Sequence, residues 1–552
     1  MEEFKLIIEI IGGFLWNNYT LYAVVATGVV FTIWSGFSQY YALTHGLKVI
    51  KGDYDKDSDP GAISHFQALS TALSATVGLG NIGGVALAIS LGGPGAVFWM
   101  WVVGFLGMAI KLSEVSLSMI HRNIDEADNP SGGPMWVVER NFANKSGLLK
   151  VLGKFIAGTF CVALIVNTIT AGNMFQAWNV ANLTEAYFGV PTIVTGLVLA
   201  IIVGSVIIGG IKRIGAVTSK LVPFMLIIYV LACIYVLALN FSSIPEMLSL
   251  IVTAAFSPME SSNAFLGGTA GSAFIFGMQR ALFSNEAGQG SSAIAHSAAK
   301  TDEPIREGVV AGLEPFIDTI VVCTMSALVI LVTGIWNRPA EVQLTEVVIA
   351  QEGQTWSLDG SFEDKESLKE GAKVFMIYSG SENTDSGNAL NKVYGTVMVE
   401  NSRKSIEWDR IKSQKIPNTD GAIYLDYVGA NLTAAAFDEV SSGLGKWLVT
   451  LASWLFAIST MISWSYYGEK GVAFLMGENA ILTYKLSFCA LAVLSTTGFI
   501  QTDRELNLFA NLGTGLCIMA NLPILWLFGY QAIRDYKVYI AKLKAGNFHR
   551  GQ

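Results

Sequence analysis

Long apolar runs constrain this 552-residue chain more than any other feature. A helix needs about 20 mostly apolar residues to cross the hydrocarbon core of a bilayer, and shorter runs of about 18 already mark candidates. Charged residues make up only 14% of the chain, against about 25% in soluble proteins, so a soluble globule is excluded. The clear runs, which predict an all-α polytopic membrane protein, are 20–37, 95–119, 151–177, 192–210, 219–241, 309–334, 446–467, 480–500 and 506–530.

Two further segments, 66–91 and 265–290, are long enough to span but carry interruptions. Gly78-Leu79-Gly80-Asn81 interrupts the first, and 276–280, Phe-Gly-Met-Gln-Arg, interrupts the second. The glycines of the first could instead form a packing face. The second could be a helix end whose Arg280 reaches the interface. Counting both segments as broken helices gives about eleven transmembrane helices.

The spacing of the two interruptions indicates an internal repeat. With the span at 20–37 set aside as an extra N-terminal helix, the other ten divide into five and five, each group beginning with a broken helix. A 5+5 inverted repeat of this kind is typical of secondary transporters, whose half-helix N-termini suit a carboxylate and whose freed carbonyls suit a small cation.

A domain plan follows from these segments. Residues 1–60 hold an interfacial helix and the extra span, 61–241 the first repeat, 242–334 the start of the second, 446–530 its remainder, and 531–552 a tail. The polar stretch 335–445 alternates like short strands and predicts a small β-rich extracytoplasmic insert. Lys and Arg in alternate short loops, such as Lys212 and Arg213, place the N-terminus outside and the C-terminus in the cytoplasm.

Several polar residues lie inside the spans. Ser459, Thr460 and Ser463 bring hydroxyls near one face of a helix, where they either complete an oxygen cage for Na⁺ or bond back to their own helix. Lys111 and Glu114, three residues apart, favour a structural pair. Glu314 and Asp318 are open candidates for carrying a proton or lying near a cation.

Catalytic chemistry finds little support in the sequence. The five histidines lack metal-ligand spacing, and neither a nucleophile elbow nor a phosphate-binding loop occurs in the required context. The net charge of −8 comes with no basic patch for nucleic acid. We therefore expect no enzyme and no nucleic-acid partner.

Several longer motifs carry a family resemblance. They are Val77-Gly-Leu-Gly-Asn-Ile-Gly-Gly-Val-Ala86, Leu91-Gly-Gly-Pro-Gly-Ala-Val-Phe-Trp-Met100, Gly132-Gly-Pro-Met135, Gly209-Gly-Ile-Lys-Arg-Ile-Gly215, Arg280-Ala-Leu-Phe-Ser-Asn-Glu-Ala-Gly288 and Ser463-Trp-Ser-Tyr-Tyr-Gly-Glu469. In these motifs, and in their order along nearly the whole chain, the sequence resembles the alanine/glycine:cation symporters, also called the sodium:alanine symporter family. Residues 351–425 look like an addition to that pattern.

The resemblance implies the fold of the neurotransmitter:sodium symporters and roles for particular residues. The main Na⁺ site would be formed by carbonyls near Ser74 and Val77 with the hydroxyls of Ser459 and Thr460. The substrate pocket would be formed by Gly78, Leu79, Gly80, Asn81, Phe175, Phe276, Gly277, Thr460 and Trp464.

The expected function is import of a small neutral amino acid, alanine or glycine, with Na⁺ across a bacterial plasma (inner) membrane. One alternative couples the same carrier to H⁺ through Glu314 or Asp318. A second alternative is a membrane solute sensor that detects its ligand with the insert. The expected partners are thus the amino acid, the co-transported ion and the lipid bilayer, and nothing in the sequence indicates an oligomeric state.

Overall fold

The computed structural model describes residues 2–548 except 56–58, 126–128, 144, 354, 366, 381–389, 401–402, 414, 428 and 501–502. Within these residues, seven helical stretches are long and apolar enough to cross a bilayer, and two bent helix pairs raise the number to nine. The count of eleven and the 5+5 division therefore remain predictions. The seven stretches are Gly95–Ile120, Leu148–Phe188, Gly210–Leu239, Pro304–Val332, Gly445–Met476, Glu478–Phe499 and Glu505–Lys544.

The first half of the chain contains helices joined by short turns, and π-helical turns at Ala42–Gly46, Gly80–Gly84 and Thr170–Met174 interrupt three of the helical stretches. Its helices are α1 (Glu2–Leu15), α2 (Asn18–Ser35), α3 (Gln39–Tyr41), α4 (Leu47–Ile50), α5 (His65–Thr76), α6 (Val85–Gly92), α7 (Gly95–Ile120), α8 (Pro134–Phe142), α9 (Leu148–Ile169), α10 (Phe175–Phe188), α11 (Thr192–Ile207), α12 (Gly210–Leu239) and α13 (Ile244–Ala254).

The second half continues the helical bundle on both sides of a β-rich segment. Its helices are α14 (Ala270–Asn285), α15 (Ser292–His296), α16 (Pro304–Ala311), α17 (Thr324–Val332), α18 (Ala430–Val440), α19 (Thr450–Met476), α20 (Ile481–Leu494) and α21 (Asp503–Lys544). A longer π-helical segment, Phe316–Cys323, precedes α17.

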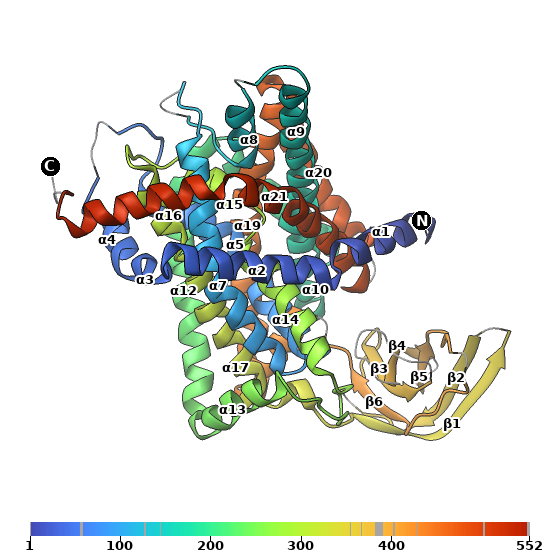
Figure 1. The fold of residues 1–552 in the computed structure, drawn as a ribbon. Helices are drawn as coiled ribbons and strands as arrows, with labels where there is room; N and C mark the ends of the chain where they lie inside the picture. The colour runs from blue at the N-terminus through green and yellow to red at the C-terminus, as the bar shows by residue number, and fades with distance from the viewer. Residues whose placement is uncertain are drawn as a thin grey trace.

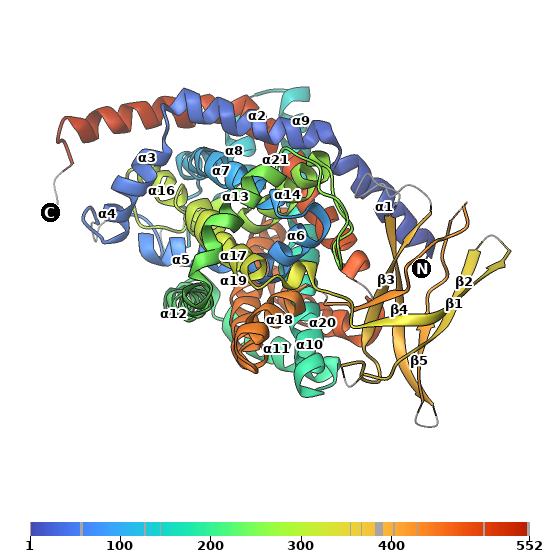
Figure 2. The same cartoon turned by 90° about the horizontal axis from the view of Figure 1, so that it is seen from below.

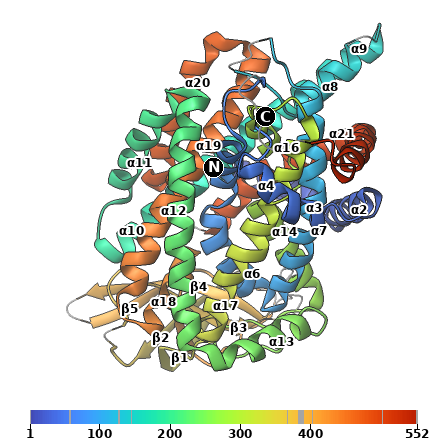
Figure 3. The same cartoon turned by 90° about the vertical axis from the view of Figure 1, so that its left-hand side faces the viewer.

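Two long helices run across the bundle. Helices α2 and α21 lie side by side and cross the upright direction of α7 and α12 (Figure 1), and both appear end-on when the molecule is turned about the vertical axis (Figure 3). The indole nitrogen of Trp526 on α21 donates a hydrogen bond to Thr27 Oγ1 on α2 at 3.0 Å. Phe31 of α2 packs against Gly529 of α21. The N-terminal and C-terminal helices therefore stabilise each other along one side of the bundle.

The first predicted helix break is present. Helix α5 begins at a capping box formed by Ser64 and Gln67 and ends at Thr76. The chain turns through 77–79 and resumes in the π-helical turn and α6, whose direction differs by 51° from that of α5. The glycines at 78–84 therefore do more than form a packing face on a continuous helix.

The second break lies further along the chain than predicted. Helix α14 runs without interruption through 276–280, so the predicted break there is wrong. The helix ends instead where Glu286 adopts a left-handed conformation with φ of 56°, and α15 begins after a turn at 286–291.

Close packing explains the glycine that suggested the wrong position. A Cβ atom on Gly277 would lie 2.4 Å from the carbonyl oxygen of Ala96, so this glycine lets α14 cross α7 at backbone contact. Arg280, for which a place at the interface was the alternative, is buried, and its guanidinium donates to the side-chain oxygens of Asn507 and Asn511 on α21 at 3.0 and 2.9 Å.

The expected β-rich insert is present beside the helical bundle, at the lower right of Figure 1. Six strands form one sheet in the order β2-β1-β6-β3-β4-β5, and the neighbouring strands are antiparallel. The sheet has its own apolar core, separate from that of the helices. The strands are β1 (Val342–Glu352), β2 (Thr355–Phe362), β3 (Lys373–Ser379), β4 (Leu390–Glu400), β5 (Arg403–Trp408) and β6 (Ala422–Leu425).

The end of the predicted insert belongs to the helical core. Residues 430–440 form α18, which leaves the sheet and packs among the helices near α17 and α10, as the view from below shows (Figure 2). Thr433 Oγ1 donates to the carbonyl oxygen of Ile82 at 3.0 Å, and a Cβ on Gly83 would lie 2.9 Å from the amide nitrogen of Ala430. Helix α18 therefore covers the first break directly.

The crossing of α14 and α7 gives a stability prediction. Gly277→Ala forces a methyl group against Ala96, so we expect the free energy of unfolding to fall by about 1–3 kcal/mol. The thermal midpoint of the purified protein in detergent measures this. Gly158→Ala in α9 is the matched control, because its Cβ would meet only the tip of Leu475 at 3.8 Å. Equal midpoints for Gly277→Ala and the parent protein would contradict the close crossing.

Candidate functional site

A small enclosed cavity lies where the first break meets the end of α14. The cavity measures about 10 Å³, which is room for about one water molecule. A solute that binds here must be small, or the walls must move apart. The lining residues, none of them ionisable, are Ala75, Thr76, Gly78, Gly80, Ala171, Gln176, Phe283, Gln289, Trp464 and Thr514.

Side-chain amides satisfy the backbone donors of the first break. The N–H of Gly78 donates to Asn81 Oδ1 at 2.8 Å, and the N–H of Leu79 donates to Gln176 Oε1 at 3.2 Å. These N–H groups have no partner within the helix once it is broken, and lipid offers none. The expected substrate donors Gly78 and Leu79 are thus paired with amide oxygens that a carboxylate would have to replace.

Gly78 brings the break into contact with α19. A Cβ on Gly78 would lie 2.6 Å from Thr460 Oγ1 and 3.3 Å from Gln176 Oε1. No larger residue fits between these two side chains without displacing them. Gly80 lies against the ring of Phe283, with 3.2 Å between a Cβ on the glycine and the ring.

The residues expected to hold Na⁺ come together between α5 and α19. Ser74 Oγ donates to the carbonyl oxygen of Ser459 at 2.6 Å. Ser459 Oγ bonds back to the carbonyl of Phe456 at 2.9 Å, which is the alternative considered for these hydroxyls. Val77 is fully buried at the end of α5.

Thr460 lies on α19 at the contact with the first break. Its Oγ1 is buried, faces Gly78 and has no hydrogen-bond partner among the described residues. The buried hydroxyls of Thr450, Ser453, Ser463 and Ser465 on the same helix also lack a partner there, so the position of Thr460 at Gly78 is what sets it apart. A buried hydroxyl without a partner is uncommon in native structures and calls for an explanation. A small cation or a polar group of a solute would provide one.

Aromatic side chains form the walls, although not all of those expected. Trp464 packs against Gly172, where a Cβ would lie 2.3 Å from the indole ring, and it lines the cavity. Phe175 is buried and contacts Phe283, with ring centroids 4.9 Å apart, but it is not among the lining residues.

Phe276 and Gly277 do not line this cavity. Phe276 lies beside Gly92, and Gly277 packs on α7. Phe283 occupies the expected place, two helical turns later on the same face of α14. The assignment failed because the break was placed about two turns too early.

Sequence reasoning also missed Gln176 and Gln289. Gln289 Oε1 accepts from Asn167 at 2.8 Å, and its Nε2 donates to the carbonyl of Leu282 at 2.8 Å. Gln176 and Gln289 are amide side chains in apolar or glycine-rich surroundings. The same signal identified Asn81 and could have identified these two residues.

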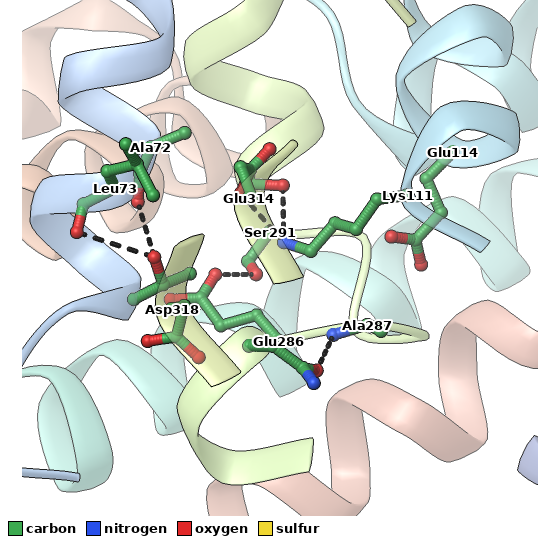
Figure 4. A network of polar contacts seen from close by, with 12 residues as sticks. Ala72, Leu73, Lys111, Glu114, Glu286, Ala287, Ser291, Glu314 and Asp318 are labelled. Atoms are coloured by element: carbon green, nitrogen blue, oxygen red, sulfur yellow. Dashed lines mark hydrogen bonds and ion pairs between the residues drawn. The ribbon is translucent and has the colours of Figure 1, made fainter. Parts of the chain in front are cut away.

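Asn81 points away from the cavity toward a buried carboxylate. Its Nδ2 donates to Asp318 Oδ1 at 2.5 Å, and the hydroxyls of Ser284 and Thr319 donate to the same carboxylate at 2.9 and 2.8 Å. The first break, α14 and the π-helical segment before α17 are therefore joined at Asp318. Figure 4 shows Asp318 close to Glu286.

Lys111 has a different partner from the one expected. Its Nζ lies 3.2 Å from Glu314 (Figure 4). The same Nζ donates to Ser292 Oγ at 2.6 Å. Glu114 instead accepts from the N–H of Gly290 at 3.1 Å and from Asn521 at 2.6 Å. Both residues thus connect α7 to the second break rather than to each other.

Comparisons with known proteins identify the family of the chain. The model of the sodium:alanine symporter family matches residues 1–362 and 419–551, which leaves out a stretch that includes β3 to β5. The sodium/alanine symporter AgcS of Methanococcus maripaludis is 35% identical over 99% of this chain and 100% of its own length. The amino-acid carrier protein AlsT of Bacillus subtilis is 31% identical over 99% of this chain and 94% of its own.

Among solved structures, the crystal structure of MhsT in complex with L-phenylalanine has a TM-score of 0.48 and 14% identity, over 87% of this chain and 99% of that one. At that TM-score the likeness is loose. The family model matches most of the chain. The two relatives above, which this chain matches over nearly their whole lengths, carry the names of a symporter and an amino-acid carrier. This membrane protein therefore belongs to the sodium:alanine symporter family.

Proposed function

We propose that the protein is a secondary active symporter that imports alanine or glycine together with Na⁺ by alternating access. The observation that carries the proposal is the position of Thr460, whose buried hydroxyl faces the broken backbone at Gly78 and finds no hydrogen-bond partner in the described part of the chain. Broken helices that meet at a small site are the usual substrate and ion sites of such carriers. The printed names of the relatives, a sodium/alanine symporter and an amino-acid carrier, support the same activity.

The cavity has room for about one water molecule, so its walls must move apart to admit a substrate, and the chemistry of its lining favours a small zwitterion. Its lining is uncharged and supplies backbone amides, side-chain amides and hydroxyls, which can bind an ammonium and a carboxylate together without adding a net charge. Trp464 and Phe283 fill the volume that a large side chain would need. We assign the substrate to Gly78, Leu79, Gly80, Gln176, Phe283, Thr460 and Trp464, and the ion to Ser74, Val77, Ser459 and Thr460.

The driving force is the sodium gradient across a bacterial plasma membrane, with the N-terminus outside and the C-terminus in the cytoplasm. Each Na⁺ that moves down 100 mV contributes about 2.3 kcal/mol from voltage alone. The basic short loops, including Lys212 and Arg213, support this orientation.

Counterflow in proteoliposomes tests the function. We expect vesicles loaded with unlabelled alanine to take up labelled alanine when Na⁺ is present and much less when it is replaced by K⁺. A screen of the twenty amino acids should rank alanine and glycine first. Alanine uptake indifferent to Na⁺ would remove the sodium assignment but keep the carrier.

Coupling to H⁺ is the second candidate, because Asp318 contacts Asn81 at the first break. Uptake that follows a pH gradient in Na⁺-free buffer would favour it. The two couplings therefore give opposite results in the same vesicles.

Thr460→Val tests the ion site. The substitution keeps the shape of the side chain and removes the unpartnered hydroxyl, so we expect the Na⁺ concentration for half-maximal uptake to rise about tenfold or more, the equivalent of a lost ligand worth about 1.4 kcal/mol. Thr450→Val is the matched control, because Thr450 lies on the same helix with a buried, unpartnered hydroxyl, ten residues from Thr460. An unchanged Na⁺ dependence in Thr460→Val would exclude this residue from the site.

Removing the sheet distinguishes a carrier from a solute sensor. The two ends of the sheet are adjacent, because Val342 pairs with Ile423. Replacing residues 342–425 by a short Gly/Ser linker therefore leaves α18 in place, and we expect alanine counterflow to persist. Complete loss of counterflow in a deletion variant that remains monodisperse would favour a role of the sheet in solute detection.

A further inference from the structure

A chain of buried ionisable side chains joins α16 to both broken helices. His296 at the end of α15 lies between two carboxylates, with Nδ1 2.5 Å from Glu307 Oε1 and Nε2 2.7 Å from Glu314 Oε1. The other oxygen of Glu307 contacts Nδ1 of His65, the first residue of α5. Each of these four side chains is at most 1% exposed.

The geometry at His296 requires one proton more than a neutral imidazole and two carboxylates carry. A neutral imidazole carries one N–H, so it can donate to one neighbour only. Both ring nitrogens of His296 face carboxylate oxygens at hydrogen-bond distance, and two carboxylates are acceptors only. One additional proton is therefore needed, either on the second nitrogen of His296 or on Glu307 or Glu314.

The surrounding charges are consistent with a bound proton. From α7, Lys111 faces Glu314 at 3.2 Å and Glu114 lies nearby, and from the second break Glu286 is bonded to Ser291 at 2.5 Å. Asp318 follows Glu314 on the same segment, and Arg122 acts on Glu307 from the end of α7. Carboxylates outnumber the cations in this buried region, so an added proton reduces the cost of burying them.

The chain reaches the surface at one end. Among the described residues, His65 Nε2 has no hydrogen-bond partner, and it lies 3.7 Å from Oδ1 of Asp55, whose side chain is 45% exposed. The opposite end stops at Lys111, beside Ser292. Ionisable groups thus connect the solvent at Asp55 to the interior next to the second break.

We propose that Glu307, His296 and Glu314 form a proton-binding site that exchanges with solvent through His65 and Asp55. The bound proton holds α15 against α16, and α16 holds α5 through His65. Any movement that separates α15 or α5 from α16 removes an acceptor and weakens proton binding. By linkage, proton binding then stabilises the arrangement with these elements together. This inference is independent of the substrate and of the coupling ion.

The pH dependence of stability tests the site without transport. An unfolded histidine releases its proton around its ordinary pKa of about 6.5. If the folded protein keeps that proton at higher pH, it binds more protons than the unfolded chain, and the ratio of folded to unfolded protein falls by up to about tenfold for each pH unit above that value. We therefore expect the thermal midpoint of the full chain in detergent to fall between pH 6.5 and 9.

Substitution locates the proton. His296→Gln should flatten the fall of the midpoint, because a neutral amide cannot hold the proton. His121→Gln is the control and should keep the parent slope, since His121 pairs with the uncharged side chains of Gln531 and Asn141. Glu314→Gln replaces one of the two carboxylates by an amide that can itself donate to Nε2 of His296, so no additional proton is needed. It should also flatten the slope, and it serves where His296→Gln does not fold. A parent slope retained in whichever of these two variants folds would overturn the proposal, and so would a parent midpoint that does not fall.

Discussion

Every polar backbone group inside a bilayer must find its partner within the protein, and the structure of this family member depends on how that requirement is met at the first break. The N–H groups of Gly78 and Leu79 are bonded to the amides of Asn81 and Gln176. Gln176 lies on α10, and Gly78 abuts Thr460 on α19. The break is therefore stable only because helices distant in sequence close around it, and the same closure produces the cavity.

Apolar length predicted most of the helices because the bilayer imposes it on each segment separately. Apolar length could not locate the second break. A glycine in an apolar run can mark either a break in a helix or a close contact between two helices. Gly78 is a break and Gly277 is a contact, and only the neighbour at 277, the carbonyl of Ala96, distinguishes them. The polar pair Asn285 and Glu286 is a better signal of the second break. A carboxylate buried in a continuous apolar helix costs free energy unless it finds a partner.

The sequence predicted those site residues that local spacing defines. It missed those that a contact between distant segments brings to the site. Gly78, Gly80 and Trp464 line the cavity as expected, whereas Gln176 and Phe283 enter it from α10 and α14. Lys111 shows the same limit. A partner three residues away is available to any helix, but the actual partner, Glu314, is 203 residues distant. It becomes a neighbour only when α7 packs against the segment that follows α16.

Both breaks leave backbone groups without partners in their own helix, and different side chains surround the two breaks. Uncharged groups line the cavity at the first break, with the carboxylate of Asp318 behind Asn81 and outside the lining. Glu114, Lys111 and Glu286 surround the second break and pair with groups of the protein itself. A zwitterion brings its own charges, so an uncharged cavity binds it without an uncompensated buried ion. Charged groups in the lining would instead favour one end of the solute and repel the other. Keeping the ionisable side chains beside the cavity, yet outside its lining, lets one region respond to protons while its neighbour holds a neutral solute.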